Sequence, residues 1–181
     1  ANLQGLIGDQ QTERANSYLV AFSQFIRKQL ELNREETITL QEEIEAIEIY
    51  VKLQQMRYEN RFTFHVETDL DTEAYLIPPM LIQPFVENAI EHGFKNINYQ
   101  GVLTLTIEEK DNKLHLILID NGNGKGMPNP HKKSLSKLIT QERLDLLFNT
   151  QQKGNAYFEA APLSPPETGY RVTIVIPVIP S

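Results

Sequence analysis

The sequence predicts an α+β protein in which a helical hairpin precedes a two-layer sandwich of helices and one sheet. Over residues 1–60, apolar side chains recur at spacings of three and four, the period of an amphipathic helix. Residues 61–181 instead contain several short alternating or apolar segments, which are typical of strands, and two further helical stretches. The chain therefore divides into a hairpin region, 1–60, and a sheet-containing domain, 61–181.

The composition is that of a soluble globular protein and excludes several classes of function. Of the 181 residues, 40% are hydrophobic and 23% are charged. The net charge of -7 argues against a broad surface for nucleic acid, so no nucleic-acid partner is expected. The absence of cysteine excludes disulfides and cysteine nucleophiles. No apolar run approaches the roughly 20 residues that span a bilayer. The first residue is Ala1, which indicates an excised fragment of a longer parent.

Two amphipathic helices are predicted in the hairpin region. The first extends from about Asp9 to Asn33, and its apolar stripe consists of Leu19, Phe22, Ile26 and Leu30. After the polar linker Arg34–Thr37, Thr39 and Glu42 form a capping box in front of the second helix. The stripe of that helix consists of Leu40, Ile44, Ile47 and Val51. Because a two-helix hairpin buries little surface, its stripes need cover from the rest of the chain or from a second copy in a four-helix bundle.

Strands and helices then follow in the sheet-containing domain. One helix is expected directly after Pro78 and Pro79, because proline is tolerated in a first turn, and another over Leu138–Phe148. A mobile loop is expected over Asn121–Ser136, which is rich in Gly, Pro, Asn and Lys. The predicted strands are Arg61–Glu67, Val102–Glu108, Leu114–Asp120, Ala156–Ala160 and Tyr170–Pro177. We expect the helices on one face of the sheet.

One side of the helix after Pro79 groups the polar residues Asn88, Glu91, His92 and, if the helix continues, Lys95. Magnesium takes few protein oxygens and keeps several waters, while cationic side chains meet phosphate charge. An amide, a carboxylate, an imidazole and an ammonium group together therefore suit hydrated Mg²⁺ with a polyphosphate. The alternative interpretation is a solvated helix face.

The segment Asp120–Gly124 follows a strongly apolar predicted strand. Its glycines allow close approach of the backbone to a ligand, and an acid at a strand end can accept a hydrogen bond from an exocyclic amine. The alternative is an ordinary Asx-Gly turn. Lys125–Lys137 then holds four lysines and no acid, which suits a lid over phosphates, with Ser134 and Ser136 just before a helix where anions bind. A solvated lysine-rich loop is the alternative there.

In this order, the segments resemble one family. Ile77–Gly93 resembles the N box of LytS-type sensor histidine kinases, and Asp120–Gly124 resembles the first glycine box of the same ATPase fold. Lys133–Ser136, followed by Ile139–Leu144, resembles the second glycine box and the helix behind it, and Gly169–Pro177 resembles the closing strand. The family's helical region after the phosphoacceptor motif is similar to Tyr18–Leu30 and Thr39–Arg57.

The resemblance implies a Bergerat-type (GHKL ATPase) sandwich over residues 61–181, and it implies roles for individual residues. Glu87 and Asn88 would be catalytic, Glu87 as a base and Asn88 as a ligand of Mg²⁺. Asp120 would bind the adenine amine, assisted through water by Thr173. The other implied nucleotide-binding residues belong to the end of the N box, the glycine box and the lid: His92, Lys95, Gly122, Gly124, Lys133, Ser134 and Ser136.

The implied function is the cytoplasmic catalytic region of a two-component sensor histidine kinase. Such an enzyme uses ATP and Mg²⁺ to phosphorylate a histidine, here upstream of this chain, and then transfers the phosphoryl group to an aspartate of a response regulator. The resemblance also implies a homodimer formed through residues 1–60, the remnant of a dimerisation and phosphoacceptor region. It further implies a parent protein anchored upstream in the inner membrane.

Two departures from the family pattern bear on this function. Ser136 stands where the second glycine box usually has glycine, and a serine there would constrain the lid or crowd the phosphates. No Pro-His-Phe-like phosphoacceptor motif occurs, so this chain is not expected to autophosphorylate by itself. The alternative is a noncatalytic dimerisation and signalling module with a degenerate nucleotide site. A serine kinase or a simple ATPase is a further alternative, against which the helical hairpin argues.

Overall fold

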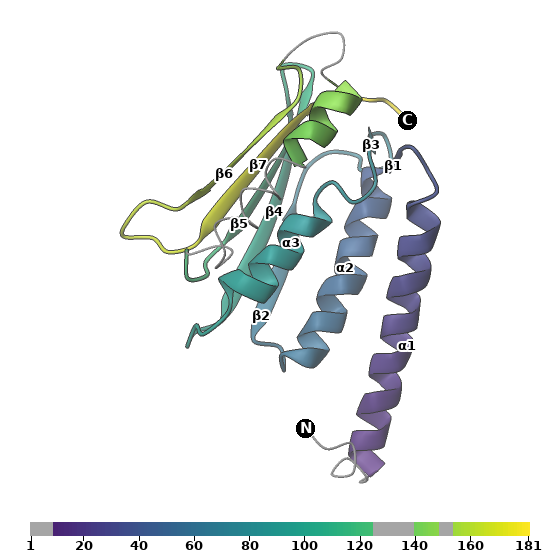
Figure 1. Ribbon diagram of the computed structural model, residues 1–181, viewed down its shortest axis with the longest axis vertical. Coiled ribbons are helices and arrows are strands. Elements are labelled where there is room, and N and C mark those ends of the chain that lie inside the picture. Colours follow the sequence, from purple (N-terminus) through teal and green to yellow (C-terminus); the bar gives the residue numbers. More distant parts are fainter. Residues whose placement is uncertain (1–8, 125–139, 149–153) are drawn as a thin grey trace.

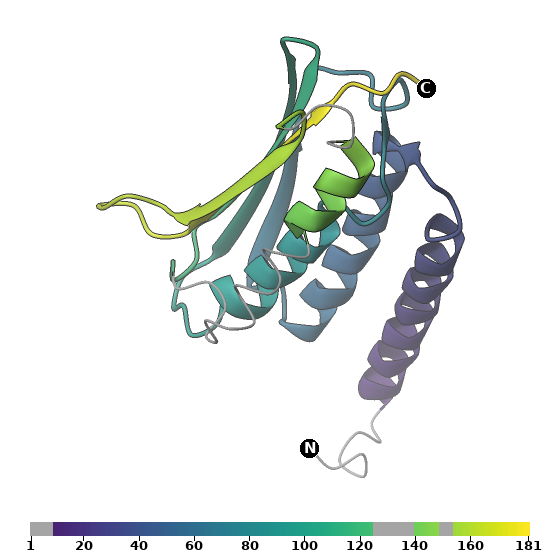
Figure 2. The same ribbon diagram turned by 45° about the horizontal axis from the view of Figure 1, so that its top comes forward.

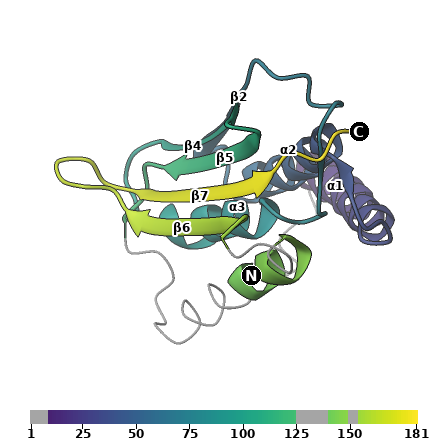
Figure 3. The same ribbon diagram turned by 90° about the horizontal axis from the view of Figure 1, so that it is seen from above.

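A five-stranded sheet with helices on one face forms the body of the computed structural model, which describes residues 9–124, 140–148 and 154–181 (Figure 1). The strand order is β2-β4-β5-β7-β6, and only the β2–β4 pair among these strands is parallel. The view from above shows the sheet as one layer and the helices as the other (Figure 3). The strands are β2 (Phe62–Glu67), β4 (Gly101–Lys110), β5 (Lys113–Asp120), β6 (Tyr157–Pro162) and β7 (Tyr170–Pro177). The predicted α+β sandwich is therefore confirmed.

The predicted strands all form, and the differences lie at their ends. β4 and β5 extend to within two residues of each other because Asp111 and Asn112, at φ 52° and 58°, make a tight hairpin turn. A further two-stranded sheet pairs β1 (Ile38–Thr39) with β3 (Leu76–Ile77). Strands of two residues are too short to leave a periodic pattern, so the sequence did not predict them.

The helices are α1 (Asp9–Leu32), α2 (Leu40–Arg57), α3 (Gln83–Asn88) and the π-helix η2 (Ala89–Gly93), and residues 140–148 are also helical. The predicted capping box is present: the Glu42 N–H donates to Thr39 Oγ1 at 3.1 Å, and the Thr39 N–H donates to Glu42 Oε2 at 2.9 Å. None of the helices in the described ranges is long and apolar enough to cross a membrane.

The helix expected directly after Pro79 begins later than predicted. Pro78 and Pro79 precede a turn in which Met80 has φ 57°, and α3 begins at Gln83 with Pro84 in its first turn. The sequence offers three prolines within seven residues, and Pro78 lies before a second proline, where helical geometry is disfavoured. The predicted helix start directly after Pro79 is therefore wrong, because the proline in the first turn of the helix is Pro84.

The two helices of the hairpin bury different amounts of their apolar stripes. The α2 stripe residues Leu40, Ile44, Ile47 and Val51 are all buried, and they share one core with the inward residues of β4 and β5. The α1 stripe is exposed by 60% at Leu19, 44% at Phe22, 40% at Ile26 and 61% at Leu30. The rest of the chain thus covers α2 but not α1. The division at residue 60 stays a prediction, since α2 packs into the same core as the sheet.

Helix α1 lies at the outer edge of the helix layer, beside α2 (Figures 1 and 2). Phe25 packs against Tyr50 with ring centroids 5.6 Å apart. Lys28 Nζ lies 3.7 Å from Glu45 Oε2, a partly exposed pair that contributes little to stability. These contacts use the side of α1 opposite to most of its apolar stripe, which leaves that stripe facing outward.

Candidate functional site

Asp120 ends the central strand β5 with a nearly buried carboxylate. The side chain is 5% exposed, and its Oδ1 accepts a hydrogen bond from the Gly122 N–H at 2.8 Å. Burial raises the pKa of Asp120 to about 6, and hydrogen bonds from the backbone N–H groups of Gly122 and Tyr170 oppose that rise. Asp120 is therefore a largely ionised acceptor at pH 7, placed where water competes weakly for it.

The glycine loop after Asp120 packs directly on the end of the N-box helix. A Cβ on Gly122 would lie 2.3 Å from the Gly93 carbonyl oxygen, so only glycine fits there. The Asn123 N–H donates to that same carbonyl at 2.8 Å, and Asn123 Nδ2 donates to the carbonyls of His92 at 3.0 Å and Lys95 at 3.1 Å. The structure thus joins the two sequence segments that were predicted to share a site.

Two residues that the sequence reasoning did not select fix the loop from the other side. Asn121 Oδ1 accepts from the Val102 N–H at 2.7 Å, and Asn121 Nδ2 donates to the Gln100 carbonyl at 3.1 Å. The Tyr99 hydroxyl donates to the Asn121 carbonyl at 2.7 Å. The only signal in the sequence was that asparagine commonly bonds to nearby backbone in turns, and that does not reveal which strand it reaches.

The geometry of the site also requires a glycine at position 169. Its φ is 136°, and a Cβ there would lie 1.9 Å from the Asp120 carbonyl oxygen. Gly124, at φ 68°, lies against it, with 3.3 Å between its hypothetical Cβ and the Gly169 oxygen. The closing strand can therefore approach Asp120 only because position 169 lacks a side chain, and Gly124 shapes the same corner.

Glu87 lies toward the helical hairpin. Gln83 Nε2 donates to Glu87 Oε1 at 3.0 Å, and Gln29 Nε2, on α1, donates to Gln83 Oε1 at 2.7 Å. Burial, and then the nearby charges of Glu87 and Glu91, raise the pKa of Tyr50 on α2. The predicted base therefore sits at the end of a polar chain that begins on α1, and Asn88 follows it, half-buried, as the last residue of α3.

The N-box helix changes its winding where the predicted site begins. The Phe94 N–H donates to the Ala89 carbonyl at 3.0 Å, five residues back, which is the bonding of the π-helix η2. The helix then ends at Gly93, so the condition under which Lys95 would share its face is not met. Lys95 is exposed beyond the helix end, so regular helical spacing does not determine its position.

His92 and Lys95 line a cleft of about 460 Å³ together with two arginines, Arg57 at the end of α2 and Arg61 just before β2. Glu91 is the acid that lines it, and Phe62 and Phe94 stack at its wall with ring centroids 5.5 Å apart. The cleft is thus cationic in an acidic chain. That His92 and Lys95 approach phosphates stays a prediction.

The register of the closing strand contradicts the expected partnership of Thr173 with Asp120. Tyr170 pairs with Asp120 across β5 and β7, while Thr173 pairs with Ile117. Directly paired residues share a face, and successive residues alternate, so Thr173 lies on the face of the sheet opposite to the Asp120 side chain. Tyr170, whose N–H bonds to Asp120, occupies the position that the sequence reasoning gave to Thr173.

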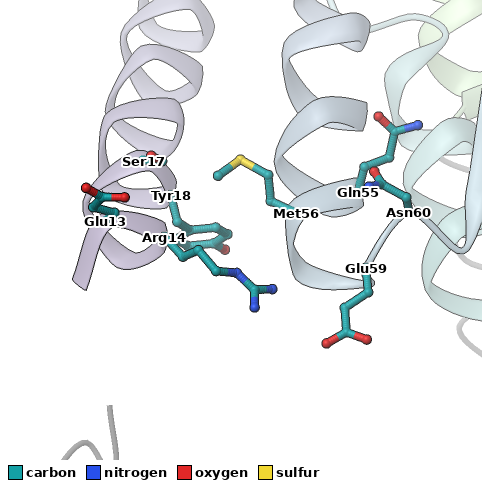
Figure 4. Close-up of a pocket in the computed structure, with 8 residues that line it drawn as sticks. All are labelled: Glu13, Arg14, Ser17, Tyr18, Gln55, Met56, Glu59 and Asn60. Atoms are coloured by element: carbon teal, nitrogen blue, oxygen red, sulfur yellow. The ribbon is translucent and has the colours of Figure 1, made fainter. Parts of the chain in front are cut away.

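Two other cavities contain no N-box residue. One, of about 520 Å³, is lined by Asp120 together with Ile119 and Arg171, whose side chains alternate to the outer face of the sheet. The other, of about 560 Å³, lies between α1 and α2, where Arg14 and Tyr18 face Met56 (Figure 4). Neither contains Glu87, Asn88 or any other N-box residue.

The predicted lid residues Lys133, Ser134 and Ser136 lie outside the described residues, as does most of the expected loop Asn121–Ser136. The helix expected behind the lid is present at residues 140–148, with Leu144 fully buried. Within the described ranges, no group of three or more His, Cys, Asp or Glu side chains could hold a metal ion. A magnesium ion here would depend on the Asn88 amide, phosphate oxygens and water, which fits the chemistry of that ion.

Sequence comparison identifies relatives of the chain. The family model described as Histidine kinase matches residues 1–62. Sensor protein LytS of Staphylococcus epidermidis is 40% identical over 113 residues, which cover 62% of this chain and 19% of that protein. Sensor protein LytS of Oceanobacillus iheyensis is 34% identical over 147 residues, which cover 78% of this chain and 25% of that protein. The chain is thus similar to sensor histidine kinases of the LytS type.

The chain spans about a fifth to a quarter of the length of these curated relatives. Solved histidine kinases share its fold at low identity. The histidine kinase domain of a blue-light activated histidine kinase from Erythrobacter litoralis has a TM-score of 0.55 at 16% identity, covering 93% of this chain and 81% of that one. The catalytic domain of histidine kinase ThkA, in a nucleotide free form, has a TM-score of 0.55 at 16% identity, covering 80% of this chain and 97% of that one. The fold is therefore that of a histidine kinase catalytic domain.

Proposed function

We propose that this chain binds ATP with Mg²⁺ and transfers the γ-phosphoryl group to a histidine upstream of it, from which a response-regulator aspartate receives it. The observation that carries the proposal is the buried Asp120 carboxylate, held by the N–H groups of Gly122 and Tyr170 beside the end of the N-box helix. An acceptor of this kind, surrounded by glycines, suits the exocyclic amine of adenine.

The adenine end of the site depends on backbone that lies close to the carboxylate. A Cβ on Gly93 would lie 3.2 Å from Asp120 Oδ1, so glycine leaves the approach to that oxygen open. Asn123 ties the loop to the carbonyls of His92 and Lys95, which holds the loop in place before a ligand arrives. Recognition of adenine by Asp120 therefore needs little rearrangement of these residues.

The phosphate end depends on the N box and on the predicted lid. Mg²⁺, when bound, neutralises charge on the phosphoryl oxygens. Asn88 would supply a protein oxygen to that ion, while Lys133, Ser134 and Ser136 would contact the phosphates from the lid. Glu87 would accept the proton of the acceptor imidazole, and its place toward α1 suits a histidine that arrives with the helical region.

The exposed stripe of α1 supports a homodimer. Its four apolar side chains are 40–61% exposed and recur at spacings of three and four, the pattern by which helices pair. A second copy of α1 would cover them and complete a four-helix arrangement. By the family resemblance, the parent protein would be anchored in the membrane upstream of this dimer.

The test is phosphotransfer in a protein extended upstream to include the acceptor histidine. Asn88→Ala should lower the rate of histidine phosphorylation by about 100-fold, because a ligand of the metal is removed, with the circular dichroism spectrum unchanged. Asn16→Ala, at an exposed position on α1, is the matched control and should retain full activity. Unchanged activity in Asn88→Ala would refute the site. No phosphotransfer and no nucleotide binding in the unmodified protein would favour the noncatalytic signalling module.

A further inference from the structure

The turn that leads into the N-box helix lacks a cap of its own. Ile82 stands at the N-cap position of α3 without any side-chain hydrogen bond to the helix. Just before it, Met80 is held at φ 57°, a conformation that a non-glycine residue adopts only when its surroundings impose it. The turn Pro79–Gln83 is therefore shaped by contacts from elsewhere in the chain.

Glu43 supplies the contacts on one side of this turn. It lies on α2 and is 0% exposed, and its carboxylate accepts hydrogen bonds from three backbone N–H groups. The Met80 N–H is 2.9 Å from Oε2, while the N–H groups of Ile82 and Gln83 are 3.0 Å and 3.4 Å from Oε1. A side chain of α2 thus caps the amino end of α3, where the helix dipole favours a negative charge.

Arg143 supplies the contacts on the other side. It comes from the helix at 140–148, and its Nη1 donates to the Met80 carbonyl at 3.1 Å while its Nη2 donates to the Pro79 carbonyl. Burial raises the pKa of Glu43 and lowers that of Arg143, and the attraction between the two charges opposes both shifts. Two helices therefore hold the turn in place. Glu43 of α2 accepts hydrogen bonds from the turn's N–H groups, and Arg143 of the helix at 140–148 donates to the turn's carbonyls.

The three elements joined at this turn lead to different parts of the proposed site. Helix α3 carries Asn88 five residues after Gln83, the helix at 140–148 follows the predicted lid, and α2 packs against α1. Hydrogen bonds to buried charges are stronger and more directional than packing contacts, so a shift of α2 cannot leave the turn in place without breaking them.

We propose that Glu43 and Arg143 are positioning residues that hold α2, α3 and the helix at 140–148 in one geometry, so that a displacement of the hairpin reaches the nucleotide site. The effect on nucleotide rests on the proposed function, whereas the mechanical link between the three helices does not. Neither residue needs to touch the ligand, so their action is distinct from that of Asp120 or Asn88.

The first measurement is the affinity of this chain for a nonhydrolysable ATP analogue with Mg²⁺, at a temperature where every variant is folded. Glu43→Gln keeps the volume but replaces one acceptor with a donor, and Arg143→Met keeps the stem but removes both donors. Each should raise Kd about tenfold, and the double variant should be little worse than either one, because both act through the same turn. The controls Glu45→Gln, on the exposed side of α2, and Arg27→Met, exposed on α1, should stay within about twofold.

The second measurement is amide hydrogen exchange in the chain without nucleotide. Glu43→Gln should accelerate exchange in both α3 and the helix at 140–148, and Arg143→Lys, which retains a donor, should show a smaller change in the same two helices. A role confined to stability would lower Tm but leave Kd unchanged in folded variants and restrict the faster exchange to α2, and that result would overturn the proposal. If the unmodified chain binds no nucleotide, the proposed function fails, and the exchange result alone then decides the link.

Discussion

Glu43 and Asp120 are both buried carboxylates, but the protein satisfies them in different ways. Glu43 is 0% exposed and bonds three N–H groups of a turn that lies about 40 residues away in the sequence. Asp120 is 5% exposed and bonds N–H groups of Gly122, in the loop after its own strand, and of Tyr170, on the neighbouring strand. Burial raises the pKa of both groups.

The difference concerns what surrounds each carboxylate. Around Glu43, the charge of Arg143 and three donors complete an internal network, so the carboxylate serves the fold. Around Asp120, the neighbours Gly93 and Gly122 lack side chains. No cationic side chain is among the groups that shift the pKa of Asp120. Loss of Glu43 should therefore lower stability and reach ligand binding only indirectly, through the turn, whereas loss of Asp120 should remove a contact with the ligand itself.

The largest effect should come from Glu43→Ala. Three buried N–H groups would lose their acceptor, and Arg143 would lose the charge near it, which together should cost about 4 kcal/mol of unfolding free energy. Urea denaturation followed by circular dichroism measures it. Glu45→Ala, on the exposed side of the same helix, should cost no more than about 0.5 kcal/mol. Equal losses in the two variants would show that the network around Glu43 contributes nothing special.

Gly122→Ala tests how closely the loop packs beside Asp120. A methyl group 2.3 Å from the Gly93 carbonyl forces the loop away from the N-box helix, and we expect a cost of about 3 kcal/mol. Gly154→Ala is the matched control. It lies at positive φ, 77°, where Gly122 does not, but no atom lies within 4 Å of its hypothetical Cβ, so backbone strain alone should cost about 1 kcal/mol. Similar costs for both would mean that contact with Gly93 does not constrain the loop.

Asp120→Asn should stabilise the chain at pH 8 while it harms binding. The folded pKa of about 6 lies above the unfolded value of 3.8, so the ionised carboxylate lowers stability by about 3 kcal/mol above pH 6, and that penalty disappears as pH falls to 3.8. Asparagine avoids the penalty but accepts fewer hydrogen bonds, so the net gain should be about 2 kcal/mol. Denaturation curves at pH 8 and pH 4 check the sign. A variant less stable than the unmodified chain at pH 8 would contradict the assignment.

A smaller effect should appear in the pH dependence of adenine recognition. Only ionised Asp120 accepts from the amine with both oxygens, so affinity should fall by up to about tenfold per pH unit below the pKa of about 6. Adenosine is the suitable probe, because it carries no phosphate that titrates in this range. Its affinity, followed by NMR between pH 7.5 and 5, should be flat above pH 6 and decline below it. An affinity that does not change over this range would remove Asp120 from recognition.

The sequence predicted local features well where a short-range pattern determines them. The capping box of Thr39 and Glu42 needs only two residues three apart, and the strand Tyr170–Pro177 was predicted with its observed ends. The meeting of the N box with Asp120–Gly124 followed from the family resemblance rather than from periodicity. The buried α2 stripe and the exposed α1 stripe look alike in sequence, because periodicity locates an apolar face without showing what covers it.

The sequence-based predictions fail where contacts between distant parts of the chain override a local sequence pattern. Lys95 was expected on the helix face only if the helix continued, and the π-helix ends at Gly93, before Lys95. The role of Thr173 was taken from the family resemblance, whereas the pairing of Asp120 with Tyr170 decides which side chains face the site. Nothing in the local sequence marks Glu43 as buried, since the turn that surrounds it lies about 40 residues away.

The proposed nucleotide site is formed by Asp120 and the N box. The most direct test is a calorimetric titration of this chain with a nonhydrolysable ATP analogue, with and without Mg²⁺, for the unmodified chain and for Asp120→Asn. We expect magnesium-dependent binding that Asp120→Asn abolishes while the chain stays folded. Absence of binding by the folded, unmodified chain, or equal binding by Asp120→Asn, would contradict this expectation.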